Sequence, residues 1–211
     1  MRLPDVFYPV AGTAREVALA AASGARFIQL RFKGPAIERP QQVRESLDCC
    51  RATGAVCVVN DHWHVALEAG AEWVHLGQED LDGLPKGALE AMKTAGVKLG
   101  ISTHDRTELR RALALGGEVQ LGYVALGPVF ATTLKVMRWH PQGLSRLGRW
   151  RRRLGNVPLV AIGGLTPGRA VACLEAGADS CAAVSALFRQ PDPAAALAAW
   201  RRSLSMQAHS P

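Results

Sequence analysis

The chain has 211 residues, of which 48% are hydrophobic and 20% charged. This balance supplies enough apolar material for a core and excludes an intrinsically disordered chain. No apolar run approaches the roughly 20 residues that cross a bilayer, and the N-terminal MRLPDVFYPV lacks the apolar run of a signal peptide, so we expect a cytoplasmic protein. The net charge of +7 fits either a polyanionic partner or an arginine-rich surface with a site for anionic substrates.

Short runs rich in Val, Ile and Leu recur along the whole chain and predict strands. Each run is almost continuously apolar, as a strand must be when both faces of its sheet are covered. In chain order the eight runs are VFYPV from Val6, RFIQLR from Arg26, VCVVN from Val56, WVHLG from Trp73, KLGIS from Lys98, YVALG from Tyr123, PLVAIGG from Pro158 and SCAAVS from Ser180.

Longer segments with helical periodicity lie between these runs. They include AREVALAAASG, QQVRESLDCCRATG, HVALEAGA, ALEAMKTAG, RTELRRALALGG, GLSRLGRWRRRLG and PGRAVACLEAGA, and AAALAAWRRSL closes the series. Several end in the glycine that favours a left-handed helix cap. In GLSRLGRWRRRLG the apolar residues recur at three- and four-residue steps, so its arginines form the solvated face of an amphipathic helix. We expect no nucleic-acid binding from this face.

Eight strand–helix pairs in about this length favour a closed (β/α)₈ barrel, the TIM-barrel class of α/β fold, over a doubly wound open sheet. We predict a single barrel domain over residues 1–205 and a disordered tail at 206–211. The five cysteines lack CxxC spacing and are expected to be buried free thiols. Barrel enzymes carry their chemistry on the loops after the C-terminal ends of the strands, so polar residues there are the candidates.

The second predicted strand carries several polar residues. In IQLRFKG, Gln29, Arg31 and Lys33 alternate with apolar residues and therefore share one face, which we expect to point into the barrel. Buried cations need anionic partners. Those partners are either a phosphate or diphosphate ligand, or Asp61 or Asp80 in an internal salt bridge.

Two carboxylates, Asp61 and Asp80, follow neighbouring strands. With phosphate oxygens and water they would complete the oxygen shell that Mg²⁺ prefers. Each also has a structural alternative, because Asp61 could cap the helix in DHWHVALEAG and Asp80 in GQEDLDG could be a solvated turn residue. The pair, with Arg31 and Lys33 close by, favours a magnesium site.

The loops after the last strands offer a second anion site. LGPVFATTLK supplies hydroxyls and a lysine, and AIGGLTPGRA places Gly163 and Gly164 before a helix, where backbone N–H groups can approach a ligand. The glycines could equally form a tight turn, and Thr166 and Pro167 are typical of a helix start. Together with Ser185, these loops match the common phosphate site of barrel enzymes.

The segments QLRFK, VVNDHWHVALEAGAEWVHLGQEDL, GISTHD, GPVFATTLK, VAIGGLTP and AAVSALF resemble the thiamine-phosphate synthase family over nearly the whole chain. The Asn–Asp pair followed by HLGQED, and the GPVF…T…K loop ahead of AIGG, are the most specific. That family joins 4-amino-2-methyl-5-hydroxymethylpyrimidine diphosphate to thiazole phosphate, releasing diphosphate and forming thiamine phosphate. The resemblance therefore implies a transferase of thiamine biosynthesis.

The resemblance also implies residue roles. Asp61 and Asp80 correspond to Mg²⁺ ligands, which makes Mg²⁺ the implied cofactor. The implied catalytic residues are Arg31, Lys33, Ser102 and Lys135. The implied substrate ligands are Gln29, Arg31, Lys33, Asn60, His75, Ser102, Thr132, Lys135, Gly164, Val184 and Ser185. The family mechanism is dissociative and needs electrostatic stabilisation of a leaving group without a protein nucleophile.

Two positions depart from the family pattern. Many members have T-x-T-K where this chain has TTLK, so Leu134 replaces a hydroxyl that could hold the thiazole phosphate. The first strand ends in PVAG in place of the usual Thr-Asp. Neither position is an implied metal or diphosphate ligand, so we expect altered thiazole-phosphate contacts with the chemistry retained.

Two other functions remain as alternatives. The related thiazole tautomerase shares the barrel, but is expected to have a histidine at the position of Pro128 and to lack the aspartate of HLGQED. A non-catalytic phosphate-binding barrel would not need the Asp61 and Asp80 pair. The expected partners are phosphorylated small molecules, without nucleic acid or membrane, and the sequence leaves a homodimer open.

Overall fold

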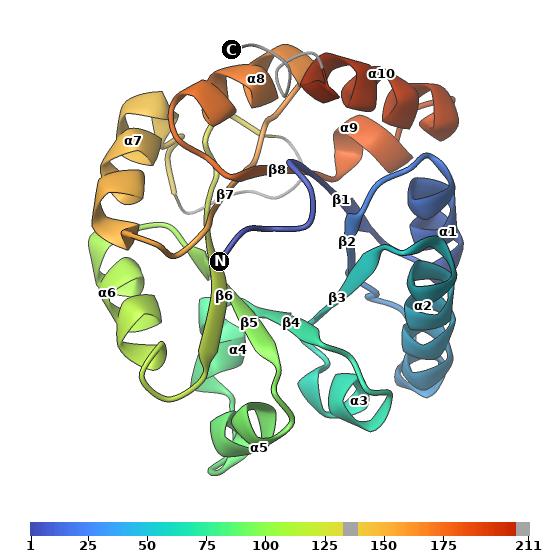
Figure 1. The fold of residues 1–211 in the computed structure, drawn as a ribbon, viewed down its shortest axis with the longest axis vertical. Coiled ribbons are helices and arrows are strands. Elements are labelled where there is room, and N and C mark those ends of the chain that lie inside the picture. Colours follow the sequence, from blue (N-terminus) through green and yellow to red (C-terminus); the bar gives the residue numbers. More distant parts are fainter. Residues whose placement is uncertain (133–138, 206–211) are drawn as a thin grey trace.

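The computed structural model describes residues 1–132 and 139–205. Within them the chain forms a closed barrel of parallel strands in the order β1-β2-β3-β4-β5-β6-β7-β8. Figure 1 shows the ring of strands surrounded by an outer ring of helices. The predicted (β/α)₈ barrel is therefore confirmed, and the predicted tail at 206–211 lies outside the described residues.

Each of the eight predicted runs overlaps one strand. The strands are β1 (Phe7–Ala11), β2 (Phe27–Leu30), β3 (Val56–Asn60), β4 (Trp73–Leu76), β5 (Lys98–Thr103), β6 (Gln120–Leu126), β7 (Leu159–Ile162) and β8 (Ser180–Ala183). The largest difference is in β6, which begins at Gln120, ahead of the predicted start at Tyr123. Pairing with β5 extends β6 backward, because Gln120 is the register partner of Lys98.

The helices follow the strands in turn. They are α1 (Ala14–Ala22), α2 (Arg39–Thr53), α3 (Trp63–Glu68), α4 (Gln78–Asp82), α5 (Ala88–Thr94), α6 (Arg106–Leu115), α7 (Gly143–Leu154), α8 (Pro167–Glu175), α9 (Ser185–Phe188) and α10 (Pro193–Ser205), with a short 3₁₀ helix at Ala36–Glu38. Short helices α4 and α9 lie directly after β4 and β8 and were not predicted. None of the helices in the described ranges is long and apolar enough to cross a membrane.

Buried side chains form two groups that alternate along the strands. Phe7 and Ile28 belong to the larger group, which also contains helix residues such as Trp150 and therefore lies between the sheet and the helices. The smaller group comes from strands alone and fills the barrel interior. Its members are Tyr8, Val10, Phe27, Val58, Trp73, Tyr123, Ala125, Val160 and Ala182.

The prediction for α7 is confirmed, and the prediction of buried thiols holds for four of the five cysteines. Helix α7 buries Leu147, Trp150 and Leu154 and exposes arginines on its other side, as its amphipathic pattern requires. All five cysteines are free thiols, and four of them are buried.

Glycines inside the strands make room for the rings that fill the barrel. A Cβ placed on Gly100 would lie 2.2 Å from Cζ of Tyr123, and one on Gly122 would lie 2.6 Å from Cζ3 of Trp73. The β5–β6 register also shifts between Leu99 and Gly100. These strand glycines therefore mark close approach of an aromatic ring.

We expect Gly100→Ala to lower the free energy of unfolding by about 1–3 kcal/mol, because the new methyl group and the Tyr123 ring cannot share the same space. Urea denaturation followed by circular dichroism measures the loss. Gly168→Ala is the matched control, since its Cβ would meet nothing within 4 Å and its site is exposed. Equal losses in the two variants would contradict the steric explanation.

Candidate active site

Predicted site residues lie together at the carboxyl ends of β2 to β5. Gln29 lies in β2, Asn60 ends β3 and His75 lies in β4, and all three side chains are buried. Asn60 and His75 are register partners in adjacent strands. Ser102 lies near the end of β5 and is half-buried. Parallel pairing of these neighbouring strands thus brings residues from separate parts of the sequence to one rim.

The prediction that Arg31 and Lys33 are buried on the inner face is wrong. Strand β2 ends at Leu30, and both cationic residues are exposed beyond it. The backbone N–H of Arg31 still donates to the Ala11 carbonyl over 2.7 Å, which holds the chain against β1 for one further residue. Burying a charge costs free energy, so long cationic side chains are favoured at the rim, where their charged ends reach water.

Lys33 and Asp61 form an ion pair between the loops after β2 and β3. The Lys33 side chain is 53% exposed and the Asp61 side chain 14%, so the carboxylate is the more desolvated partner. Burial alone would raise the pKa of Asp61, but the hydrogen bond and charge of Lys33 outweigh burial and hold that pKa below its ordinary value. The salt bridge considered from the sequence therefore forms, with Asp61 as its acid.

The structural alternatives for the two aspartates are both wrong. Helix α3 begins at Trp63 and has His62, not Asp61, at its N-cap. Asp61 instead has a left-handed φ of 64°, which aspartate tolerates better than most residues. Asp80 lies within α4, and its Oδ2 accepts a hydrogen bond from the backbone N–H of Gly77 over 2.9 Å. The five residues of α4 are too few for helical periodicity to be recognised.

The carboxyl groups of Asp61 and Asp80 act on each other. Burial, and after it the negative charge of Asp61, raises the pKa of Asp80, whereas the pKa of Asp61 is lowered. Opposite shifts of this kind are typical of two carboxyl groups that compete for one proton. A divalent cation held between them would relieve the repulsion, and carboxylate oxygens are ligands that suit Mg²⁺.

The donor set therefore fits Mg²⁺ if other ligands come from outside the protein. Across residues 1–132 and 139–205, no three or more His, Cys, Asp or Glu side chains form a metal-binding cluster. Two carboxylates alone leave most of an octahedral shell to water and to oxygens of a bound substrate. This is the arrangement expected where a metal is bound together with a phosphorylated ligand.

A line of hydrogen bonds runs from Ser102 into the barrel interior. Ser102 Oγ lies 2.8 Å from His75 Nε2, and His75 Nδ1 lies 2.8 Å from Tyr123 Oη. Tyr123 Oη lies 2.7 Å from Tyr8 Oη, and Gln29 Nε2 donates to Tyr8 Oη over 2.9 Å. Burial lowers the pKa of His75 to about 4, so its imidazole is neutral at pH 7. Burial also raises the pKa of both tyrosines, which keep their protons.

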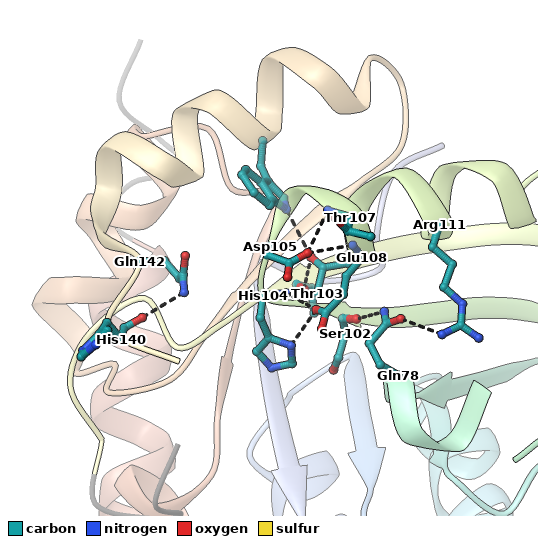
Figure 2. A network of polar contacts seen from close by, with 12 residues as sticks. Gln78, Ser102, Thr103, His104, Asp105, Thr107, Glu108, Arg111, His140 and Gln142 are labelled. Atoms are coloured by element: carbon teal, nitrogen blue, oxygen red, sulfur yellow. Dashed lines mark hydrogen bonds and ion pairs between the residues drawn. The ribbon is translucent and has the colours of Figure 1, made fainter. Parts of the chain in front are cut away.

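Ser102 is also held through its backbone. Gln78 Nε2 donates to the Ser102 carbonyl over 2.7 Å, and Arg111 Nη1 donates to Gln78 Oε1 over 3.3 Å. Figure 2 shows Gln78 lying between Ser102 and Arg111. Arg111 in turn forms an ion pair with Asp82 at 2.7 Å. The rim of β5 is thereby connected to α4 and α6.

The loops after β6 and β7 approach each other closely at Gly164. This residue has a φ of 65°, and a Cβ on it would lie 2.3 Å from the Ala131 carbonyl oxygen. Arg169 connects the same loops, because its Nη1 donates to the Gly164 carbonyl over 2.7 Å and its guanidinium lies 4.7 Å from the Phe130 ring centre. Thr166 Oγ1 caps α8, as its sequence predicts. The tight-turn interpretation is thus confirmed, and anion binding here stays a prediction.

The other predicted ligands of the second anion site lie on the loops after β6 and β8. Val184 and Ser185 follow β8 directly, and Ser185 begins α9. Thr132 is half-buried and ends the first described range. Lys135 and Leu134 lie outside the described residues, so the roles predicted for them stay predictions.

Three residues of the rim and interior were not predicted as part of the site: Tyr8, Tyr123 and Arg169. For the tyrosines there was a signal, because a hydroxyl inside a strand buried on both faces must find a partner. The roles of Gln78 and Arg169 depend on distances between separate elements, which no local sequence pattern carries.

The structure defines a parallel β/α barrel with polar residues gathered at the ends of its strands. The family model described as thiamine monophosphate synthase matches residues 8–187. The chain belongs to the thiamine monophosphate synthase family, which confirms the resemblance found in its motifs.

Individual relatives agree with this assignment. A thiamine-phosphate synthase of Rhizobium etli is 45% identical over 205 residues, and one of Neisseria meningitidis is 40% identical over 204 residues; each match covers 95% of both chains. Among solved structures, a thiamine phosphate pyrophosphorylase from Pyrococcus furiosus superposes with a TM-score of 0.79 at 27% identity, and covers 95% of both chains.

We expect Asp61→Asn to lower the pKa of Asp80, because the substitution removes the neighbouring negative charge that helps to raise it. Asparagine also tolerates the left-handed φ at this position. Titration of ¹³C-labelled carboxyl groups by NMR measures the shift. Asp48→Asn is the control, since that aspartate is exposed and paired with Arg51. An unchanged or higher pKa for Asp80 would contradict the coupling of the two carboxyl groups.

Proposed function

We propose that this chain is a thiamine-phosphate synthase that condenses 4-amino-2-methyl-5-hydroxymethylpyrimidine diphosphate with thiazole phosphate, releasing diphosphate. The observation that carries the proposal is the Asp61 and Asp80 pair beside Lys33 at the barrel rim, in a chain of this family. Two partly buried carboxylates that repel each other destabilise the folded protein, and a cation bound between them would remove the repulsion.

One group of residues is proposed to bind the diphosphate that leaves. Mg²⁺ held by Asp61 and Asp80 would supply positive charge to the leaving diphosphate. Arg31 and Lys33 are exposed cations beside that site, placed to bind the same anion. Ser102 presents a hydroxyl at the end of β5.

The second substrate is assigned to the loops after the last strands. We assign the thiazole phosphate to the backbone N–H groups of Gly164 and Ser185, which follow β7 and β8, and to Thr132 on the loop after β6. Lys135 is assigned to the diphosphate from the family motif. The proposed mechanism is dissociative, so the protein stabilises charge and orients the two reactants without forming a covalent bond.

A cytoplasmic location is part of the proposal. Five free cysteines, four of them buried, accord with a reducing compartment. The proposed ligands are both phosphorylated small molecules, which suits a chain with a net charge of +7.

The test supplies purified protein with both substrates and Mg²⁺ and measures thiamine phosphate and diphosphate. We expect turnover that is lost when the metal is chelated, and a fall in kcat of about 100-fold or more in Asp61→Ala, because leaving-group charge is then poorly stabilised. Lys135→Ala is expected to reduce kcat strongly as well.

Asp48→Ala is the matched control, because this aspartate is exposed on α2, paired with Arg51 and remote in sequence from the rim residues. It should keep wild-type turnover. A wild-type protein that forms no thiamine phosphate under these conditions would refute the synthase assignment. Isomerisation of the thiazole without condensation would support the tautomerase alternative. Binding of the ligands without turnover would support the non-catalytic phosphate-binding barrel.

A further inference from the structure

Five polar side chains form an unbroken hydrogen-bonded line between Gln29 and Ser102. The order is Gln29, Tyr8, Tyr123, His75, Ser102, and consecutive polar atoms lie 2.7 to 2.9 Å apart. The three middle residues are buried, at 7% exposure or less. A line of this kind has a direction, because each hydroxyl carries only one proton to donate.

Gln29 determines that direction at the interior end. Its Nε2 can only donate, so Tyr8 Oη accepts. Within the described ranges the partners of Tyr8 Oη are Gln29 and Tyr123, so the Tyr8 proton goes to Tyr123. Tyr123 must then direct its own proton to Nδ1 of His75.

The same donor-to-acceptor direction continues through His75 to Ser102 at the rim. An imidazole whose Nδ1 accepts a hydrogen bond carries its proton on Nε2, and that nitrogen faces Ser102 Oγ at 2.8 Å. Ser102 Oγ therefore accepts from His75, and among residues 1–132 and 139–205 no acceptor takes its own proton, which can point to a ligand. The opposite direction would leave the Tyr8 proton buried without an acceptor, which is unfavourable in a dry interior.

Packing keeps the members of the line in place. The His75 and Tyr123 rings stack with centroids 5.5 Å apart and an interplanar angle of 14°. Tyr8 stacks on Phe27 with centroids 4.2 Å apart, and Gly100 leaves the space that the Tyr123 ring occupies. Packed rings keep the oxygen and nitrogen atoms of the line within hydrogen-bond distance of one another.

We propose that Tyr8, Tyr123 and His75 are positioning residues which form an internal hydrogen-bond relay, set by Gln29, that holds the Ser102 hydroxyl as a donor toward an anionic oxygen of the substrate. The identity of that oxygen, on the diphosphate, rests on the proposed function. The direction of the relay rests only on the hydrogen bonds.

The direction is tested by ¹⁵N NMR of histidine-labelled wild-type protein, since protonated and unprotonated ring nitrogens have distinct shifts. His75→Gln assigns the His75 signals by their disappearance. We expect the proton of His75 on Nε2. A proton on Nδ1, as would follow if the Gln29 amide were turned end for end, or protons on both nitrogens at neutral pH, would overturn the relay.

Kinetics test the role of the relay. Tyr123→Phe removes the donor to His75, so we expect kcat to fall about 10-fold or more with KM for the diphosphate substrate nearly unchanged. Tyr8→Phe should cost less, because Tyr123 can still donate to His75. It should also keep the proton of His75 on Nε2, whereas Tyr123→Phe should give a mixture of the two tautomers.

Thr103→Val is the matched control for loss of a buried hydroxyl. Thr103 lies next to Ser102, but its Oγ1 bonds the Ala125 carbonyl and Trp150 Nε1, outside the relay. We expect its kcat to stay within about 2-fold of wild type. A Tyr123→Phe variant no slower than Thr103→Val would overturn the positioning role. A wild type without synthase activity, but with its His75 proton on Nε2, would refute the proposed function and leave the relay direction established.

Discussion

Closure of the parallel sheet is the constraint on which the rest of this structure depends. In a closed barrel all strands end on one rim, so residues far apart in the chain become neighbours there. The Lys33 and Asp61 ion pair, the interaction of Asp61 with Asp80, and the bond from Gln78 to Ser102 all join separate strand ends. These three contacts join neighbouring strands, whereas the Tyr8–Tyr123 hydrogen bond joins β1 to β6 across the interior and therefore depends on closure.

The rim carries charge that the fold does not balance by itself. Lys33 lowers the pKa of Asp61, yet the same Asp61 charge raises the pKa of Asp80. Lys33 and Arg31 both lower the pKa of Asp61, and a cation bound between the two carboxyl groups would lower the pKa of Asp80 as well. Such unbalanced charge at a strand-end rim is typical of sites that bind ligands, because the ligand completes the electrostatics.

The barrel interior holds both packed aromatic rings and a line of hydrogen-bonded polar groups. Aromatic rings fill most of it, and their hydroxyls are all accommodated in one line of hydrogen bonds that ends at the rim. Strand glycines are the counterpart of these rings, since Gly100 and Gly122 leave the space that Tyr123 and Trp73 occupy. The interior therefore supports the site as well as the fold.

Local periodicity and short motifs were enough to predict the order of strands and helices, the barrel class and the family. They did not predict that Arg31 and Lys33 lie exposed beyond β2, or that Asp61 pairs with Lys33 and does not cap α3. They also did not predict that Tyr8 and Tyr123 connect Gln29 to His75. Burial, pKa and hydrogen-bond direction arise from contacts between elements distant in the chain, which a local pattern does not encode.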